Sequence, residues 1–122
     1  MKLIRAIIRP EKEGEVLEAL NDGGFEAYSK LNIRGRGKQK GVKVGETHYQ
    51  ELTKTMLLIV VENEEKKDEA IEIIIDSART DTENLKASGL QVNMSQPGRP
   101  GDGKIFVSDI NEAYTISDGS GL

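Results

Sequence analysis

Near the middle of the chain stands the run Thr55-Met56-Leu57-Leu58-Ile59-Val60-Val61, in which nearly every side chain is apolar. A short continuous apolar run is typical of a strand that is buried within a protein. We therefore expect a strand over residues 55–62. The same pattern indicates that this strand lies at the centre of a sheet and is covered on both faces.

Before this run, the sequence predicts a strand, a helix and a weaker second strand. Pro10 ends the first strand and fits the first turn of the helix, which Gly23-Gly24 ends. The helix is amphipathic, with its apolar side chains on one face. The predicted ranges are 2–9 for the first strand, 12–22 for the helix, with Val16, Leu17 and Leu20 on its apolar face, and 25–34 for the second strand.

After the run, the sequence predicts a helix, a long connection and one or two strands. The connection contains Ser, Asn, Gly and two prolines, and it is long for an ordinary loop. The tail after the last strand is expected to fray. The predicted ranges are 66–79 for the helix, with Ile71, Ile74, Ile75 and Ala78 in its stripe, 80–103 for the connection, 104–108 for a strand, 112–116 for a short final strand and 117–122 for the tail.

This order of elements is βαββαβ plus a short last strand, and it predicts an α+β ferredoxin-like fold. We expect one domain over residues 1–122, with an antiparallel sheet and two helices on one face. The open face is too apolar to remain in contact with water. The chain also has no tryptophan and only two phenylalanines. Both features favour an oligomer that adds buried surface.

The composition limits the classes of function. The net charge of −4 argues against a general nucleic-acid-binding protein. The absence of cysteine excludes disulfides and thiolate metal sites. No apolar run approaches the roughly 18 residues of a membrane span, and the N-terminus does not resemble a signal peptide. We therefore expect a cytoplasmic protein.

Two segments rich in glycine and lysine indicate ligand chemistry: Gly35-Arg36-Gly37-Lys38-Gln39-Lys40-Gly41, in a long excursion over 35–53, and Gly101-Asp102-Gly103-Lys104. Glycines let the backbone approach a ligand and turn N–H groups toward an anion, and lysines add charge. Together at strand ends, the two segments would form a phosphate site. Alternatives are a flexible basic loop, a tight turn before a strand, and a nucleic-acid tether. The tether is disfavoured because the loop lacks interleaved aromatics.

Other reactive side chains offer little evidence of catalysis. His48 is the only histidine, and no cysteine or second histidine could share a metal with it. We interpret it as an exposed loop residue, and Tyr49 as a residue that packs or contacts a partner. Asp102 is better suited to fixing its loop than to acting as a base. We therefore predict that the protein is not an enzyme. A slow ATPase is the weaker alternative, and loss of product release in Lys104→Ala would support it.

Four motifs, in order along the chain, resemble the P-II (GlnB-like) nitrogen regulatory family. They are Ile7-Ile8-Arg9-Pro10, the segment Gly35–Gly41, Ala78-Arg79-Thr80 and the segment Gly101–Val107. Residues 35–58 are most similar to the nitrogenase-regulating (NifI-type) subgroup, and to the first of its two paralogues.

The resemblance implies a homotrimer, or a hetero-oligomer with a paralogue, that binds ATP or ADP between subunits. It implies 2-oxoglutarate beside ATP, bound through Mg²⁺, and a T-loop over about 36–53 that contacts nitrogenase or another nitrogen-metabolism protein. An enlarged B-loop over about 80–103 would hold the phosphates. The implied site residues are Ser29, Lys38, Gln39, Gly101, Asp102, Gly103 and Lys104 for nucleotide, Gln39 and Lys54 for 2-oxoglutarate, Gln39 for Mg²⁺, and Arg36, Lys40, Lys43, His48 and Tyr49 for the partner.

The sequence departs from the family pattern in three places. About twenty residues separate Thr80 from Gly101, where the family has only a few. Thr115 and Ser117 stand where the family usually has arginines that reach a neighbour's nucleotide. The T-loop is short, and Tyr49 does not match the tyrosine that uridylylated members modify, so uridylylation is not expected. The first two departures leave open an interaction subunit with weakened or lost sensing.

Overall fold

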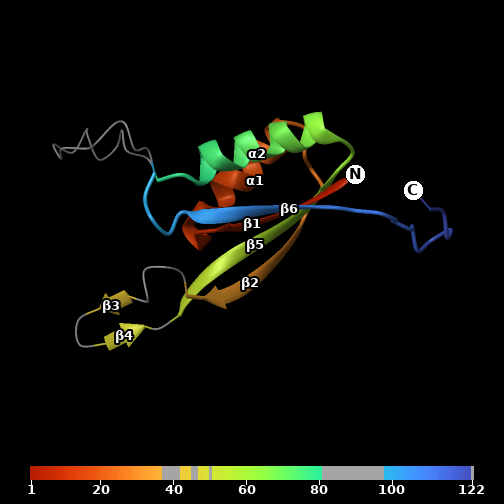
Figure 1. The fold of residues 1–122 in the computed structure, drawn as a ribbon. Coiled ribbons are helices and arrows are strands. Elements are labelled where there is room, and N and C mark those ends of the chain that lie inside the picture. The colour runs from red at the N-terminus through yellow and green to blue at the C-terminus, as the bar shows by residue number, and fades with distance from the viewer. Residues whose placement is uncertain (37–41, 45–46, 50, 81–97, 122) are drawn as a thin grey trace.

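The described residues form a four-stranded antiparallel sheet with two helices on one face and a separate two-stranded hairpin (Figure 1). This computed structural model describes residues 1–36, 42–44, 47–49, 51–80 and 98–121. The strand order is β2-β5-β1-β6, which confirms the predicted α+β ferredoxin-like fold. The elements are β1 (Lys2–Ile8), a 3-10 turn η1 (Pro10–Lys12), α1 (Glu13–Asp22), β2 (Ser29–Gly35), β3 (Val42–Val44), β4 (Thr47–Tyr49), β5 (Leu52–Val61), α2 (Glu64–Ala78) and β6 (Gly103–Asp109).

Local sequence signals explain where the two helices begin and end. Pro10 starts η1, whose turn leads directly into α1. Gly24 adopts a positive φ of 92° just after α1, a conformation that glycine allows at little cost. Asn63 caps α2, because its Oδ1 accepts a hydrogen bond of 2.9 Å from the backbone N of Lys66.

The core lies between the sheet and the helices. Alternate residues of β1 and β5 point toward the helices, as the two-residue period of a strand requires. Ile4 and Ile59, for example, are paired in register and both are buried. The core cluster consists of Ile4, Ala6, Ile8, Val16, Leu20, Leu57, Ile59, Val61, Ala70, Ile74 and Ala78.

The other face of the sheet is apolar and uncovered within this chain. Val60 is 58% exposed, and Leu31 and Phe106 are each 50% exposed. The expectation that strand 55–62 is covered on both faces is therefore wrong for the single chain. The helices cover only one face, and β5 is apolar on the open face as well.

The apolar stripe of α2 differs from the predicted one by one residue. Ile74 and Ala78 are buried and Ile71 packs against the core, as expected, but Ile75 is 40% exposed. Ile73 packs against the core in its place. Each helical step rotates about 100°, so neighbouring isoleucines cannot all share one face.

Two loop regions also differ from the expectation. The excursion over 35–53 contains a hairpin, in which β3 pairs with β4. Residues 112–116 do not form a strand, because Tyr114 makes only an isolated bridge to Gly121. The described part of the tail, through residue 121, is folded into a turn, since Gly119 N donates to Thr115 O at 2.8 Å.

Candidate functional site

The two glycine- and lysine-rich segments leave the same end of the sheet. β1 and β2 end there, and β5 and β6 begin there, because each neighbouring pair of strands is antiparallel (Figure 1). Gly35 closes β2 at this end, and Gly103 opens β6. The predicted ligand residues Lys38 and Gln39, and the predicted partner contact Lys40, lie outside the described residues.

The backbone before β6 follows a path that requires glycine. Gly101 and Gly103 have φ values of 93° and 134°, in the region that side chains disfavour. A Cβ on Gly103 would lie 1.9 Å from the carbonyl oxygen of Ile7. The last turn of the B-loop therefore packs directly against the end of β1, and only glycine fits at residue 103.

The carboxylate of Asp102 holds this loop together from inside. Its Oδ1 accepts hydrogen bonds from Arg9 Nε at 3.0 Å and from Thr80 Oγ1 at 2.5 Å. Its Oδ2 accepts from the backbone N of Thr80 at 3.0 Å and of Arg99 at 2.7 Å. Thr80 and Arg99 flank residues 81–98, so one carboxylate joins the two ends of that segment. The side chain fixes the loop, as the sequence suggested, and is fully engaged in doing so.

The hydrogen bonds also determine the charge of Asp102. Burial alone would raise the pKa of this carboxyl, but the hydrogen bonds from Thr80, Arg99 and Arg9 outweigh it and lower the pKa to about 2. Asp102 is therefore ionised at neutral pH, and it cannot act as a general base of matched pKa.

Lys54 connects the start of β5 to the B-loop. Its Nζ donates to the carbonyl oxygen of Gly101 at 2.7 Å. Burial, and then the nearby charge of Arg9, lower the pKa of Lys54. No carboxylate of the described residues forms an ion pair with it. Lys54 is half-buried, and its described hydrogen-bond partner is a neutral carbonyl. A cation in this position is suited to bind an anion.

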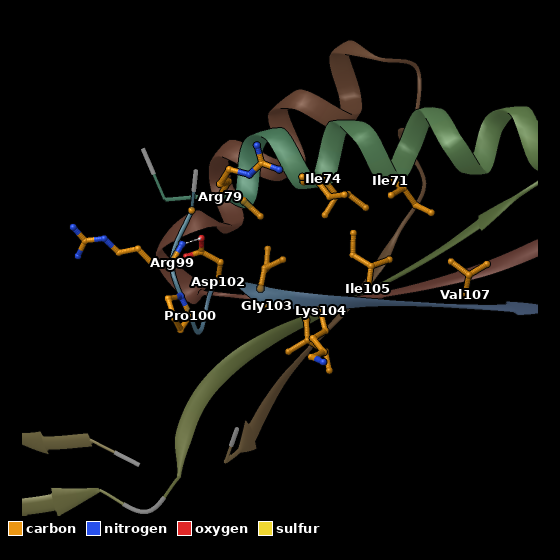
Figure 2. Close-up of a pocket in the computed structure, with 15 residues that line it drawn as sticks. Ile71, Ile74, Arg79, Arg99, Pro100, Asp102, Gly103, Lys104, Ile105 and Val107 are labelled. Atoms are coloured by element: carbon orange, nitrogen blue, oxygen red, sulfur yellow. Dashed lines mark hydrogen bonds between the residues drawn. The ribbon is translucent and has the colours of Figure 1, made fainter. Parts of the chain in front are cut away.

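The remaining predicted nucleotide residues lie in two places. Lys104 is exposed and points away from α2, toward the open face of the sheet (Figure 2). It pairs with Ile7 in the sheet register, close to the B-loop turn. Ser29 begins β2 at the opposite end of that strand from Gly35, so a single chain does not bring Ser29 and the B-loop together.

The predicted partner contacts fall on and beside the β3–β4 hairpin. Lys43 and His48 are opposite each other in the register, and Tyr49 is opposite Val42. Arg36 is exposed and follows the end of β2. The hairpin stands apart from the four-stranded sheet (Figure 1). It therefore presents these positions away from the core.

A pocket of about 660 Å³ lies between α2 and β6 (Figure 2). The B-loop closes one end of it, with Arg79, Arg99 and Asp102. Its long walls are apolar, and its lining at the B-loop end also includes Gly103 and Lys104. The apolar lining residues are Ile7, Ile8, Ile71, Ile74, Ile75, Ala78, Ile105 and Val107.

The described residues contain no group of three His, Asp or Glu side chains that could hold a metal ion. None of the described helices is both long enough and apolar enough to cross a membrane.

Three residues that donate hydrogen bonds to Asp102 were not among the predicted site residues. Arg9 and Thr80 occur in the motifs that carry the family resemblance, but they received no role there. Arg99 contributes a backbone N–H, which its sequence context does not reveal. The first two bonds link residues 93 and 22 positions apart, so only the fold brings these groups together.

The four-stranded sheet with two helices on one face and the B-loop turn at one end places the described residues in the α+β ferredoxin-like class. Residues 1–120 match the family described as nitrogen regulatory protein P-II. The chain therefore belongs to the P-II family.

The individual relatives agree with the subgroup resemblance. The chain is 45% identical over 119 residues to a nitrogen fixation nifHD2 region GlnB-like protein 1 of Methanosarcina barkeri, which covers 98% of this chain and 96% of the relative. It is 44% identical, with the same coverage, to the nifHD region GlnB-like protein 1 of Methanothermococcus thermolithotrophicus. It is 37% identical over 98% of this chain and 91% of the relative to nitrogen regulatory protein P-II 2 of Methanothermobacter thermautotrophicus. The two nifHD-region relatives confirm the resemblance to the NifI-type subgroup.

Proposed function

We propose that this P-II protein is a cytoplasmic, non-enzymatic sensor that binds ATP or ADP together with 2-oxoglutarate. The observation that carries the proposal is the B-loop, where Gly101 and Gly103 adopt positive φ values beside Lys54 and Lys104. Backbone N–H groups and cations arranged in this way favour phosphate and carboxylate groups.

The residues have separate roles in this proposal. The B-loop glycines and Lys104 hold the phosphates, together with Lys38 and Gln39 of the basic loop. Lys54 takes a carboxylate of 2-oxoglutarate, and Gln39 is a ligand of the Mg²⁺ ion. When bound, MgATP would supply negative charge and a Mg²⁺ ion to which 2-oxoglutarate could also bind.

We propose that the T-loop segment 36–53 transmits the bound state to nitrogenase or to another nitrogen-metabolism protein. The names of two relatives place them in nifHD regions, which supports nitrogenase as the partner. A ligand that binds one loop conformation better shifts the population toward that conformation by its difference in affinity. Lys43 and His48 in the hairpin, with Arg36, Lys40 and Tyr49, provide the contact positions.

The test is isothermal titration calorimetry with MgATP, in the absence and presence of 2-oxoglutarate. The proposal predicts binding that 2-oxoglutarate strengthens, and loss of that effect in Lys54→Ala. Lys66→Ala is the control, because Lys66 lies on α2 and pairs with Glu69. Co-purification from a native extract, with and without both ligands, identifies the partner.

A second function is supported by Thr115 and Ser117, which occupy positions where the family usually has arginines. In this alternative the chain is an interaction subunit with weakened sensing, and it works in a hetero-oligomer with a paralogue. Nucleotide binding by this chain alone, sensitive to 2-oxoglutarate, would reject the alternative. Nucleotide binding only after mixing with the paralogue would support it.

A further inference from the structure

Arg9 bridges the two sides of the B-loop turn. Its Nε donates to Asp102 Oδ1 at 3.0 Å, and its Nη2 donates to the carbonyl oxygen of Pro100 at 3.1 Å. These two acceptors flank Gly101, whose φ of 93° makes it the point where the backbone turns. One guanidinium therefore holds the residue before and the residue after that turn.

The backbone of Arg9 is itself fixed. Arg9 follows the last residue of β1 and precedes Pro10, which limits its backbone to the extended conformation that it adopts. Its carbonyl oxygen accepts a hydrogen bond from Lys12 N at 3.0 Å. The side chain is 29% exposed, and that of Asp102 is 18% exposed. The guanidinium is thus presented to the loop from a rigid strand end and is partly shielded from water.

We propose that Arg9 is a positioning residue, whose guanidinium fixes the backbone around Gly101 before a phosphate-bearing ligand binds. This inference rests on the proposed nucleotide site, but Arg9 needs no contact with the ligand. A loop already held in its binding conformation loses less freedom on binding, and so binds more tightly. Lysine cannot replace arginine here, because its ammonium lacks the planar fork that reaches two acceptors at once.

Arg9 also affects Lys54, the residue that we propose binds 2-oxoglutarate. Lys54 donates to the carbonyl oxygen of Gly101, and the charge of Arg9, after burial, lowers the pKa of Lys54. Glu11 and Asp102 act on Lys54 in the opposite direction. The pKa of Lys54 therefore reports whether the charge at residue 9 is in place, whether or not nucleotide binds.

The experiment uses the full chain with Arg9→Ala, Arg9→Lys and the control Arg34→Ala. Arg34 is an exposed arginine on β2 to which no role is assigned. For each variant we would measure the Kd for MgATP, the hydrogen exchange of amides 98–104 and the pKa of Lys54 by NMR. An intact sheet is checked from the exchange of β1 and β5 amides in the same samples.

The inference predicts that Arg9→Ala weakens MgATP binding by about tenfold, the cost of losing a charge-assisted hydrogen bond. Exchange of the B-loop amides becomes faster by a similar factor, and the pKa of Lys54 rises. Arg9→Lys resembles Arg9→Ala in binding and exchange, but keeps the wild-type pKa of Lys54. Arg34→Ala changes none of these.

Wild-type Kd and B-loop exchange in Arg9→Ala would overturn the inference. So would full rescue of binding by Arg9→Lys, since charge alone would then suffice. If the wild-type chain binds no MgATP, the proposed function fails, and amide exchange still decides whether Arg9 orders the loop. If Arg9→Ala does not fold, the Kd and the amide exchange of Arg9→Lys decide, because lysine keeps the charge but cannot bond Asp102 Oδ1 and Pro100 O at once.

Discussion

At the scale of single residues, Gly103 is the position where the site depends most directly on residue type. Its Cα lies so close to β1 that a Cβ would meet Ile7 O at 1.9 Å, and its φ is 134°. We expect Gly103→Ala to lower the free energy of unfolding by about 2–3 kcal/mol through backbone strain, and to weaken nucleotide binding. Chemical denaturation measures the first effect and calorimetry the second.

The matched control is Gly14→Ala in α1. A Cβ at this residue would have no atom within 4 Å, and its backbone is helical. We expect a gain of about 0.5 kcal/mol, because alanine favours helix over glycine. Equal stability of the two variants would contradict the close packing of Gly103 against β1.

Asp102 gives the second residue-scale prediction, in the form of a pH dependence. Its pKa is about 2 in the folded chain, below its unfolded value of about 3.9. The resulting stability, about 2 kcal/mol, is present above pH 4 and is lost as the pH falls through 2. Asp102→Asn should remove it, so wild type and variant should differ at pH 7 and converge near pH 2. Denaturation curves at pH 7, 4 and 2.5 test this, and a difference independent of pH would refute it.

These residue-scale contacts could be predicted from the sequence only in part. The glycine and lysine pattern indicated a loop that accommodates an anion, and Asp102 was interpreted as a residue that fixes the loop. The bonds from Arg9 and Thr80 to Asp102 could not be predicted. They connect distant parts of the chain, and their geometry depends on how β1, α2 and β6 meet.

At the scale of elements, the apolar periodicity of the sequence was sufficient to predict those helices and strands that bury a regular set of side chains. The strand containing Leu57 and Ile59, and the helix containing Ile74, were predicted for this reason. The β3–β4 hairpin was missed because each strand has only three residues, too few for a periodic pattern to be recognised. A final strand over 112–116 was predicted wrongly, since those residues have strand-like composition but no neighbouring strand among the described residues.

The cap of α2 gives the element-scale prediction. Asn63 Oδ1 satisfies the backbone N–H of Lys66, one of the groups that a helix start leaves without an intrahelical partner. Asn63→Ala should therefore lower the free energy of unfolding by about 1 kcal/mol. Glu72→Ala, an exposed change in the middle of the same helix, should stay within about 0.5 kcal/mol. Thermal and urea denaturation of both variants measure this, and equal losses would show that the cap contributes nothing.

At the scale of the whole molecule, the open face of the sheet exposes apolar side chains that no described part of the chain covers. Leu31 of β2, Val60 of β5 and Phe106 of β6 are each at least half exposed there. An apolar face of this kind is typical of a surface that another subunit covers. The sequence predicted an oligomer, but register and burial were needed to show which face is left open.

We therefore expect Phe106→Glu to shift the protein toward the 13.4 kDa monomer, because it adds a negative charge to this face. Glu18→Lys on the exposed side of α1 should leave the assembly unchanged. Sedimentation equilibrium measures the mass of both variants. A Phe106→Glu variant with the wild-type mass would exclude this face as the subunit contact.

The most direct measurement is the titration of the purified chain with MgATP, with and without 2-oxoglutarate, alongside Lys104→Ala. Our account predicts heat of binding, a lower Kd when 2-oxoglutarate is present, and weaker binding in the variant. No binding by the correctly assembled wild-type protein, or equal binding by Lys104→Ala, would contradict the claim that the B-loop is a phosphate site.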